Sequence, residues 1–279
     1  ALENKDVFLS HVINSSMPWS VDAIIHMGGC SSTIERDESF LTRNNYEYTK
    51  QLATFALNKD IRFIYASSAA TYGSGLKGFS DEVDLETLAP LNLYGHSKHK
   101  FDMWAKEQGV LNRIVGLKYF NVFGPSEYHK KEMQSMVRRG YLQVLDSGKI
   151  RLFKSYNPKY ADGDQERDFL YVKDAVEMTL FFLDKSEIGG IFNAGTGVAR
   201  TWNELTDAVF KAMDREVTVE YIDMPDAIRD QFQYRTCAKI DKIRNAGYSR
   251  PITSLEDATT DYIQNYLLSN KRLLNTVKN

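Results

Sequence analysis

The sequence has little cysteine, no long apolar run and no excess of charge of either sign, and each shortage excludes a class of protein. Two cysteines, Cys30 and Cys237, cannot form a disulfide framework, and so few fit a reducing compartment. No apolar stretch approaches the roughly 20 residues that a membrane helix needs. A net charge of -2 gives no electrostatic reason to expect nucleic acid or an anionic membrane as partner. We therefore expect an ordinary globular protein.

The chain also lacks the G-x-x-G-x-x-G fingerprint with which a dinucleotide-binding sheet usually begins, and its first residue is not methionine. We expect the full protein to carry a further βαβ segment of roughly 30–50 residues with a glycine-rich turn ahead of Ala1. The sequence also shows no metal-binding motif, because no histidine stands at the spacing from a cysteine or carboxylate that metal ligands usually have. We predict no metal site.

What the chain does have is an alternation of short apolar runs with longer amphipathic ones. The apolar runs, rich in β-branched and aromatic residues, predict buried strands at 21–27, 62–67, 113–120 and 190–195. The amphipathic runs predict helices at 38–59, 94–108 and 173–185. Such alternation is typical of a parallel sheet covered on both faces. The prediction is an α/β fold with a doubly wound, Rossmann-like parallel sheet that is N-terminally incomplete.

From about residue 121 the alternation loosens, which favours a second, smaller lobe of mixed α/β structure. The pattern there predicts a helix at 129–149, a strand at 150–155, a polar loop at 156–166, a helix at 202–214 and a strand at 218–223. We assign a dinucleotide-binding domain to 1–120 with parts of 168–215. We assign a substrate-binding lobe to 121–167 and 216–279.

Three polar segments follow predicted strands, and the parallel topology should bring them together. They are GGCSST at 28–33, SAATYG at 68–73 and NVFGP at 121–125. Right-handed crossovers place the carboxyl ends of parallel strands on one edge of the sheet. We therefore expect the three segments to line one crevice.

Tyr94 and Lys98 stand four residues apart in a predicted helix and so share one of its faces. A phenol titrates at about 10, and a nearby ammonium favours its ionised form. Ser68, at the end of a predicted strand, can offer a hydroxyl to the same substrate oxygen, whereas Ser67 favours a simple turn. A solvated helix face is the alternative for the Tyr-Lys pair alone. Together with the crevice segments, the pair favours general acid/base catalysis.

Four segments, SSAATYG, YGHSK, YFNVFGP and RDFLYVKD, resemble the extended short-chain dehydrogenase/reductase family that acts on nucleotide sugars, and the resemblance covers nearly all of the chain. It implies that Ser68, Tyr94 and Lys98 are catalytic and that Lys98 also holds the nicotinamide ribose. The segment KYFNVFGPSEYHKKEM further resembles epimerases of the family and implies a second acid/base, Lys130. A solvated lysine at a helix start is the alternative for Lys130.

The resemblance implies NADP as cofactor, with NAD as the alternative, and an ADP-sugar as substrate. The residues implied around the cofactor are Lys5, Met27, Gly28, Gly29, Cys30, Ser31, Asn44, Lys98 and Val122. The residues implied around the nucleotide sugar are Asn121, Glu132, Arg139, Phe153, Lys154, Ser155, Tyr156, Arg167 and Phe232. A guanidinium fork suits a diphosphate, although a salt bridge with Asp168 or Glu166 is the alternative for Arg167.

The chain departs from the family pattern beyond the missing fingerprint. The family usually has Gly-Ser where Lys131 and Glu132 stand, and His and Tyr where Arg139 and Phe232 stand. The alternatives that stay open are another nucleotide-sugar epimerase or reductase, and a non-catalytic or truncated relative. Dehydration is disfavoured, because two alanines at 69–70 stand where dehydratases carry an acidic pair. The resemblance also implies a cytoplasmic homo-oligomer, a pentamer, that serves lipopolysaccharide precursor synthesis.

Overall fold

A computed structural model describes residues 4–14, 20–229 and 232–269 of the chain. Its contacts divide the chain into two units, each built from three segments. The first unit comprises Ala1–Tyr119, Met178–Asn193 and Ile240–Tyr248. The second comprises Phe120–Glu177, Ala194–Lys239 and Ser249–Asn279. Residues 240–248, expected in the second lobe, belong to the first unit, where Lys242 Nζ donates a hydrogen bond to the Ile191 carbonyl at 2.7 Å.

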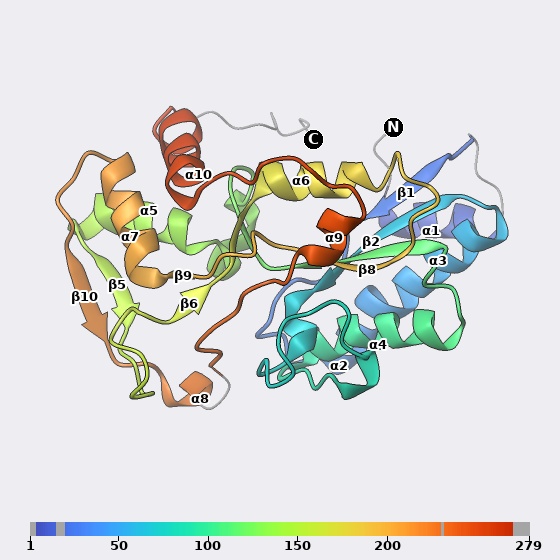
Figure 1. Cartoon of the computed structure of the whole chain (residues 1–279), viewed down its shortest axis with the longest axis horizontal. Helices are drawn as coiled ribbons and strands as arrows, with labels where there is room; N and C mark the ends of the chain where they lie inside the picture. The colour runs from blue at the N-terminus through green and yellow to red at the C-terminus, as the bar shows by residue number, and fades with distance from the viewer. Residues whose placement is uncertain (1–3, 15–19, 230–231, 270–279) are drawn as a thin grey trace. The chain divides into compact units, whose positions relative to one another are not determined.

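The first unit is built on a four-stranded sheet with the order β1-β2-β3-β8 (Figure 1). The strands are β1 Ala23–His26, β2 Arg62–Ser68, β3 Ile114–Tyr119 and β8 Gly190–Ala194. β1 pairs with β2, and β2 with β3, in parallel, so that Ser68 stands opposite Tyr119. All four predicted strands are present, and the parallel α/β sheet is confirmed.

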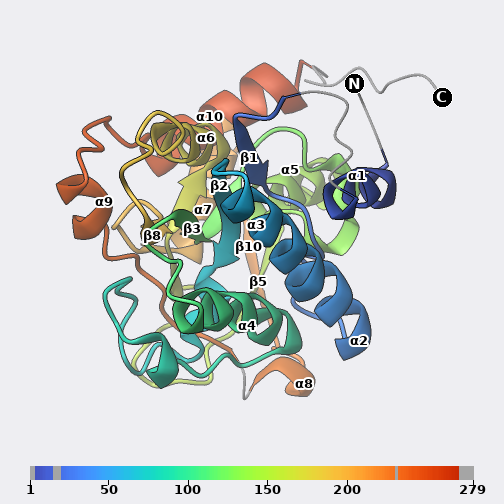
Figure 2. The ribbon, with the colours of Figure 1, turned by 90° about the vertical axis from the view of Figure 1, so that its right-hand side faces the viewer.

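Helices lie on both faces of this sheet (Figures 1 and 2). They are α1 Lys5–Ile13, α3 Tyr48–Asn58, α4 Leu93–Glu107 and the C-terminal part of α6 Val172–Phe181. The short helix α9 Asp241–Asn245 also belongs to this unit. Because alternate strand residues point to opposite faces, Phe63 and Tyr65 of β2 pack against α3 and α4. On the other face, the ring of Phe182 packs on Phe192 of β8 with centroids 4.6 Å apart.

The predicted helix at 38–59 is interrupted by a π-helical turn. α2 Glu38–Leu41 is followed by the π segment Thr42–Glu47 and then by α3. A π turn shifts the side chains that follow it relative to a regular helix, and such turns are frequent at functional sites. The turn here carries Asn45, which is 1% exposed.

Within its described residues, the second unit contains three two-stranded sheets and several helices. The parallel pairs are β4 Asn121–Phe123 with β7 Phe169–Tyr171 and β5 Ile150–Phe153 with β10 Val219–Ile222. The antiparallel pair is β6 Glu166–Arg167 with β9 Arg200–Thr201. Its helices are α5 Met136–Ser147, α7 Trp202–Ala212, α8 Asp226–Arg229 and α10 Leu255–Tyr262. Across the described ranges of both units, no helix combines the length and the apolar character that crossing a bilayer requires.

The helix predicted at 129–149 begins later than the sequence pattern indicates. Residues Tyr128–Met133 form a 3₁₀ turn, and within it Lys131 takes φ 47° and ψ -116°, a conformation that no helix tolerates. α5 starts after Ser135, whose hydroxyl accepts a hydrogen bond from Arg138 N at 3.3 Å. A serine cap satisfies a free N–H of the first helical turn, so the helix begins there.

Candidate active site

Ser68, Tyr94 and Lys98 come together in the first unit, at the carboxyl end of β2 and the first turns of α4. The Tyr94 phenol is hydrogen-bonded to the Ser68 hydroxyl. The Lys98 ammonium lies against the same strand, where it donates to the Ala66 carbonyl at 3.0 Å. The strand thus fixes the serine and the helix fixes the other two side chains. The expected turn at Ser67 is instead made by Ser68, whose oxygen accepts from the backbone two residues on at 3.1 Å.

The surroundings of the pair shift both pKa values. Burial raises the pKa of the Tyr94 phenol, while the hydrogen bond with Ser68 opposes that rise. Burial lowers the pKa of Lys98 to about 8, although the nearby Asp102 and Cys30 favour its charged form. Lys98 is 7% exposed. A lysine that titrates this close to neutral pH can stabilise a neighbouring phenolate and exchange its own proton.

The loop at 27–31 after β1 is held by Asn45, a residue that the sequence analysis did not single out. The Asn45 side chain accepts from Cys30 N at 2.8 Å, and it donates to the Cys30 carbonyl at 3.0 Å and to Ser97 Oγ at 2.9 Å. It therefore ties the loop to α4. The one available signal was an asparagine pair in the middle of an amphipathic run, where asparagine is unfavourable.

Glycine is required at position 29 of this loop. Gly29 has φ +130°, and a Cβ there would lie 2.8 Å from Asn45 Oδ1 and 3.5 Å from Lys98 Nζ. The loop backbone can therefore approach a ligand closely. An ammonium has three donors, and Lys98 directs one to the sheet, which leaves others for ligand hydroxyls. These features fit a nicotinamide dinucleotide.

The other residues predicted around the cofactor divide between the units. Lys5 donates a hydrogen bond from its ammonium to the Asn44 side chain, so these two come together. Met27 is 45% exposed and accepts a hydrogen bond on sulfur from Tyr119 OH at 3.6 Å. Gly28 and Ser31 are exposed and Cys30 is a half-buried free thiol, whereas Val122 lies on β4 in the second unit.

Lys130 lies in the 3₁₀ turn of the second unit, and this turn is closed by Glu127. The Glu127 carboxylate is 4% exposed and accepts hydrogen bonds from Ser135 N and Ser135 Oγ, both at 2.6 Å, and from Tyr262 OH at 2.9 Å. Lys130 N donates to the Glu127 carbonyl at 3.1 Å. The backbone of the turn is thereby fixed, while the Lys130 side chain is exposed. Its catalytic role stays a prediction.

Lys131 adopts a backbone conformation that favours glycine. It has φ 47°, and the family resemblance predicts a glycine at this position. We expect Lys131→Gly to raise the free energy of unfolding by about 1 kcal/mol, because strain of about 1–3 kcal/mol is relieved and part of it is offset by glycine's unfolded-state entropy. Urea unfolding measures the change. Lys131→Ala keeps the strain and serves as the control; a glycine variant no more stable than the alanine variant would contradict the explanation.

Arg167 lies in the second unit with its guanidinium between aromatic rings. It is 8% exposed, and its Cζ stands 5.6 Å from the centre of the Trp202 ring and 5.0 Å from that of Phe232. One nitrogen donates to the Glu166 carbonyl at 2.7 Å. Burial lowers the pKa of Arg167 to about 10. The Phe232 ring thus lies beside the guanidinium.

The salt bridge that was the alternative for Arg167 does not form. The Glu166 carboxylate pairs with Arg235 Nε at 2.6 Å. The Asp168 carboxylate accepts hydrogen bonds from the backbone N–H and the hydroxyl of Thr196, at 2.7 and 2.8 Å. Within the described residues, no carboxylate oxygen lies within 4.0 Å of the Arg167 guanidinium. A buried guanidinium without an acidic partner suits an anionic ligand.

The predicted segment at 153–156 begins at the last residue of β5 and ends at the exposed Tyr156. Lys154 Nζ and Tyr156 OH both donate to Asp223 Oδ1 at 3.1 Å. The Arg229 guanidinium lies 3.8 Å from the centre of the Tyr156 ring, and the ring is 43% exposed. Ser155 N donates to a carboxylate at 2.6 Å, and Phe153 is half-buried. The remaining predicted substrate residues, Asn121, Glu132 and Arg139, are exposed.

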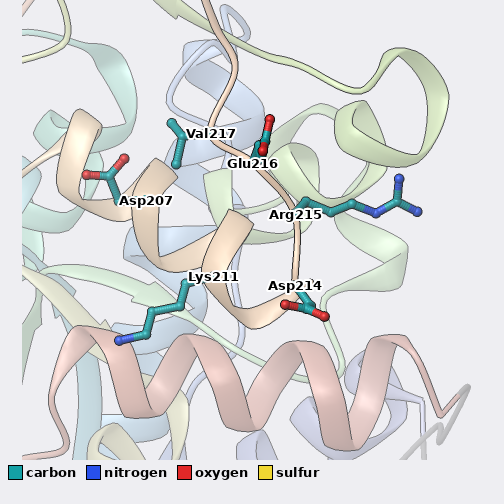
Figure 3. Close-up of a pocket in the computed structure, with 6 residues that line it drawn as sticks. All are labelled: Asp207, Lys211, Asp214, Arg215, Glu216 and Val217. Carbon is teal, nitrogen blue, oxygen red and sulfur yellow. The ribbon is translucent and has the colours of Figure 1, made fainter.

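A surface hollow at the end of α7 contains none of the predicted site residues (Figure 3). It is lined by Asp207, Lys211, Asp214, Arg215, Glu216 and Val217. In Figure 3 the side chains of Lys211 and Arg215 point in different directions, so the two cations do not converge on one ligand position. The hollow is therefore not the candidate active site.

The comparison with known proteins shows the family of the chain. Residues 11–195 match the NAD dependent epimerase/dehydratase family. The chain belongs to this family. It is 50% identical over 265 residues to the ADP-L-glycero-D-manno-heptose-6-epimerase of Nitratidesulfovibrio vulgaris (strain DP4), which covers 95% of the chain and 82% of that protein. It is 47% identical over 258 residues to the enzyme of the same name from Fusobacterium nucleatum, covering 89% and 78%.

A crystal structure supports the same relationship. The ADP-L-glycero-D-manno-heptose-6-epimerase of Helicobacter pylori superimposes with a TM-score of 0.76 at 26% identity, covering 94% of this chain and 77% of that chain. The family resemblance predicted from four short segments and the predicted Rossmann-like α/β fold are confirmed. Homologues of this chain are epimerases, an isomerase class.

Proposed function

We propose that the chain is an ADP-L-glycero-D-manno-heptose 6-epimerase, which inverts C6 of ADP-D-glycero-D-manno-heptose through transient oxidation to a ketone and re-reduction. The observation that carries the proposal is the Ser68–Tyr94–Lys98 group, in which a phenol is hydrogen-bonded to a serine and shares a helix face with a buried lysine. The names of the relatives at 47–50% identity support the choice of substrate.

The three residues divide the proton transfer at the sugar hydroxyl among them. Tyr94 accepts the proton of the C6 hydroxyl as the hydride leaves the carbon, and it returns a proton in the reverse step. Lys98 stabilises the phenolate by its charge. Ser68 donates a hydrogen bond to the same sugar oxygen and orients it. A nicotinamide held by Lys98 and the loop at 27–31 would supply a hydride acceptor and donor for C6.

Inversion requires that the hydride return to the opposite face of the ketone, so the ketone turns over between the two transfers. A second acid/base is then needed near the turned oxygen, and we assign this role to Lys130. Its turn is anchored by a buried carboxylate, which gives the exposed side chain a fixed origin.

The second unit supplies groups suited to the nucleotide diphosphate. Among the described residues Arg167 has no acidic partner and lies buried between aromatic rings, so a diphosphate can accept hydrogen bonds from the guanidinium N–H groups that the Glu166 carbonyl does not take. The Arg229 guanidinium covers one face of the exposed Tyr156 ring, and an adenine base can stack on the other face. We assign the cofactor to the first unit and the ADP-sugar to the second, NADP rather than NAD as the cofactor, and a cytoplasmic homo-oligomer as the working form.

The experiment that tests the proposal follows the cofactor balance. Oxidation and re-reduction cancel, so the protein loaded with NADP is expected to convert the D-glycero to the L-glycero sugar without net change in the absorbance of NADPH. Chromatography of the product measures epimerisation. Stoichiometric NADPH release, or conversion that stops without added NADPH, would instead indicate a dehydrogenase or a reductase.

A further inference from the structure

A buried ion pair lies behind the acid/base group, and the proposed function makes no use of it. Lys118 Nζ of β3 stands 3.3 Å from Asp102 Oδ2 of α4, and the two side chains are 1% and 0% exposed. Such a pair adds little stability over apolar residues of the same size, because removing both charges from water is costly. Its presence therefore calls for a role other than stability.

The partners of the pair all belong to β2 and the turn after it. Asp102 accepts hydrogen bonds from Tyr65 OH at 2.9 Å and from Ser67 Oγ at 2.7 Å. Lys118 donates to Thr71 Oγ1, and its ammonium lies 4.7 Å from the centre of the Tyr72 ring. The carboxylate thus joins the middle of α4 to two points on β2.

These two elements also carry the acid/base group. Asp102 follows Lys98 by one helical turn, and Ser67 precedes Ser68 directly. We propose that Asp102 is a positioning residue, which holds α4 against β2 and keeps Lys98 charged for proton transfer by Tyr94. The inference rests on the proposed catalytic role of Tyr94 and Lys98.

The charges around Lys98 support this reading. Asp102 opposes the effect of burial on the pKa of Lys98, and so does Cys30 of the loop after β1. The positive charge of Lys118 on β3 pairs with Asp102 and so weakens the effect of that carboxylate on Lys98. Tyr65 of β2 is a neutral neighbour that donates a hydrogen bond to Asp102. Burial lowers the pKa of His99, the residue after Lys98 on α4; the charge of Asp102 opposes this shift and that of Lys118 adds to it. Burial, together with the charge of Lys98, lowers the pKa of His26 at the end of β1 to about 4, so His26 is neutral at neutral pH.

The test compares Asp102→Asn with Lys118→Met in the NADP-loaded enzyme. Phenolate stabilisation needs protonated Lys98, so kcat falls as the pH rises through the pKa of Lys98. Without the Asp102 charge, Lys98 loses its proton more easily, and we expect this alkaline limb to move by roughly one pH unit to lower pH. Without the Lys118 charge, the carboxylate acts on Lys98 alone, and the limb moves to higher pH. We expect kcat of Asp102→Asn to fall about tenfold at little change in KM.

Asp84→Asn is the matched control, because Asp84 is an exposed carboxylate that pairs with Lys106 of α4, the helix that carries Asp102. Its pH profile should stay that of the wild type. Limbs that do not move in either variant would overturn the inference and leave the pair a packing feature. If Asp102→Asn does not fold, two other variants test the inference. Lys118→Met must move the alkaline limb to higher pH. Ser67→Ala keeps the Asp102 charge, so it must lower kcat without moving the alkaline limb. A Tyr94→Phe variant with near-normal turnover would contradict the proposed function itself.

Discussion

Tyr94→Phe is expected to lower epimerisation by at least about 10²-fold, the usual scale for a positioned acid/base group. The phenylalanine keeps the ring but removes the hydroxyl that is hydrogen-bonded to Ser68 and that takes the sugar proton. Affinity for the ADP-sugar should change little, because the bulk of the side chain is retained. Steady-state epimerisation gives the rate, and calorimetric titration with the nucleotide sugar gives the affinity.

The control for this variant is Tyr46→Phe. Tyr46 is a half-buried tyrosine of the same unit, and the ammonium groups of Lys50 and Lys100 lie over its ring. Its loss of a hydroxyl should leave turnover within a few-fold of the wild type. Equal, small losses in both variants would show that the Tyr94 hydroxyl transfers no proton. The YGHSK segment would then be a packed helix start and nothing more.

The parts of the fold that follow from local pattern were predictable. β2 is a continuous apolar run between polar ends, and a strand is the element that buries such a run on both sides. Tyr94 and Lys98 share a helix face because of their spacing alone, and Ser68 reaches them because parallel strands end at one edge. Each of these inferences needs only residues that are near in sequence, or the general topology of the sheet.

Other parts of the site depend on contacts between distant residues, and no local pattern reveals them. Asn45 acts through Ser97, which lies 52 positions away, and Asp102 through Ser67, 35 positions away. An asparagine or aspartate in a helix is ordinarily a solvated residue, so only the three-dimensional contacts show that these two are buried. The late start of α5 was missed for the same reason, since the Glu127 carboxylate that closes the turn is held by Tyr262, 135 positions along the chain.

Arg167 shows how the structure decides between two readings of one residue. From the sequence, a salt bridge with a neighbouring carboxylate and a diphosphate site were equally reasonable. The structure gives both neighbouring carboxylates other partners. Among the described residues the buried guanidinium therefore has a backbone carbonyl but no carboxylate as partner, which favours the diphosphate.

Lys130→Met is expected to reduce epimerisation by at least about 10²-fold as well, since a cycle that inverts the carbon needs a base on each face of the ketone. Methionine keeps the length and flexibility of the side chain but cannot carry a proton. The chain provides a close control in Lys131→Met, because Lys131 is the next residue of the same turn and is also exposed. That variant should stay within a few-fold of the wild type.

The double variant Tyr94→Phe with Lys130→Met separates two bases of one cycle from two independent contributions. If both serve the same ketone, one missing base already stops inversion, and the double variant should lose little beyond the worse single variant. Independent structural effects would multiply instead. The reduced cofactor gives a second measurement: Lys130→Met should still pass hydride from C6 to NADP and back on the original face, so NADPH should form transiently in a single turnover although the sugar is not inverted. Normal inversion by Lys130→Met would remove Lys130 from the mechanism and return the chain to the broader class of nucleotide-sugar enzymes.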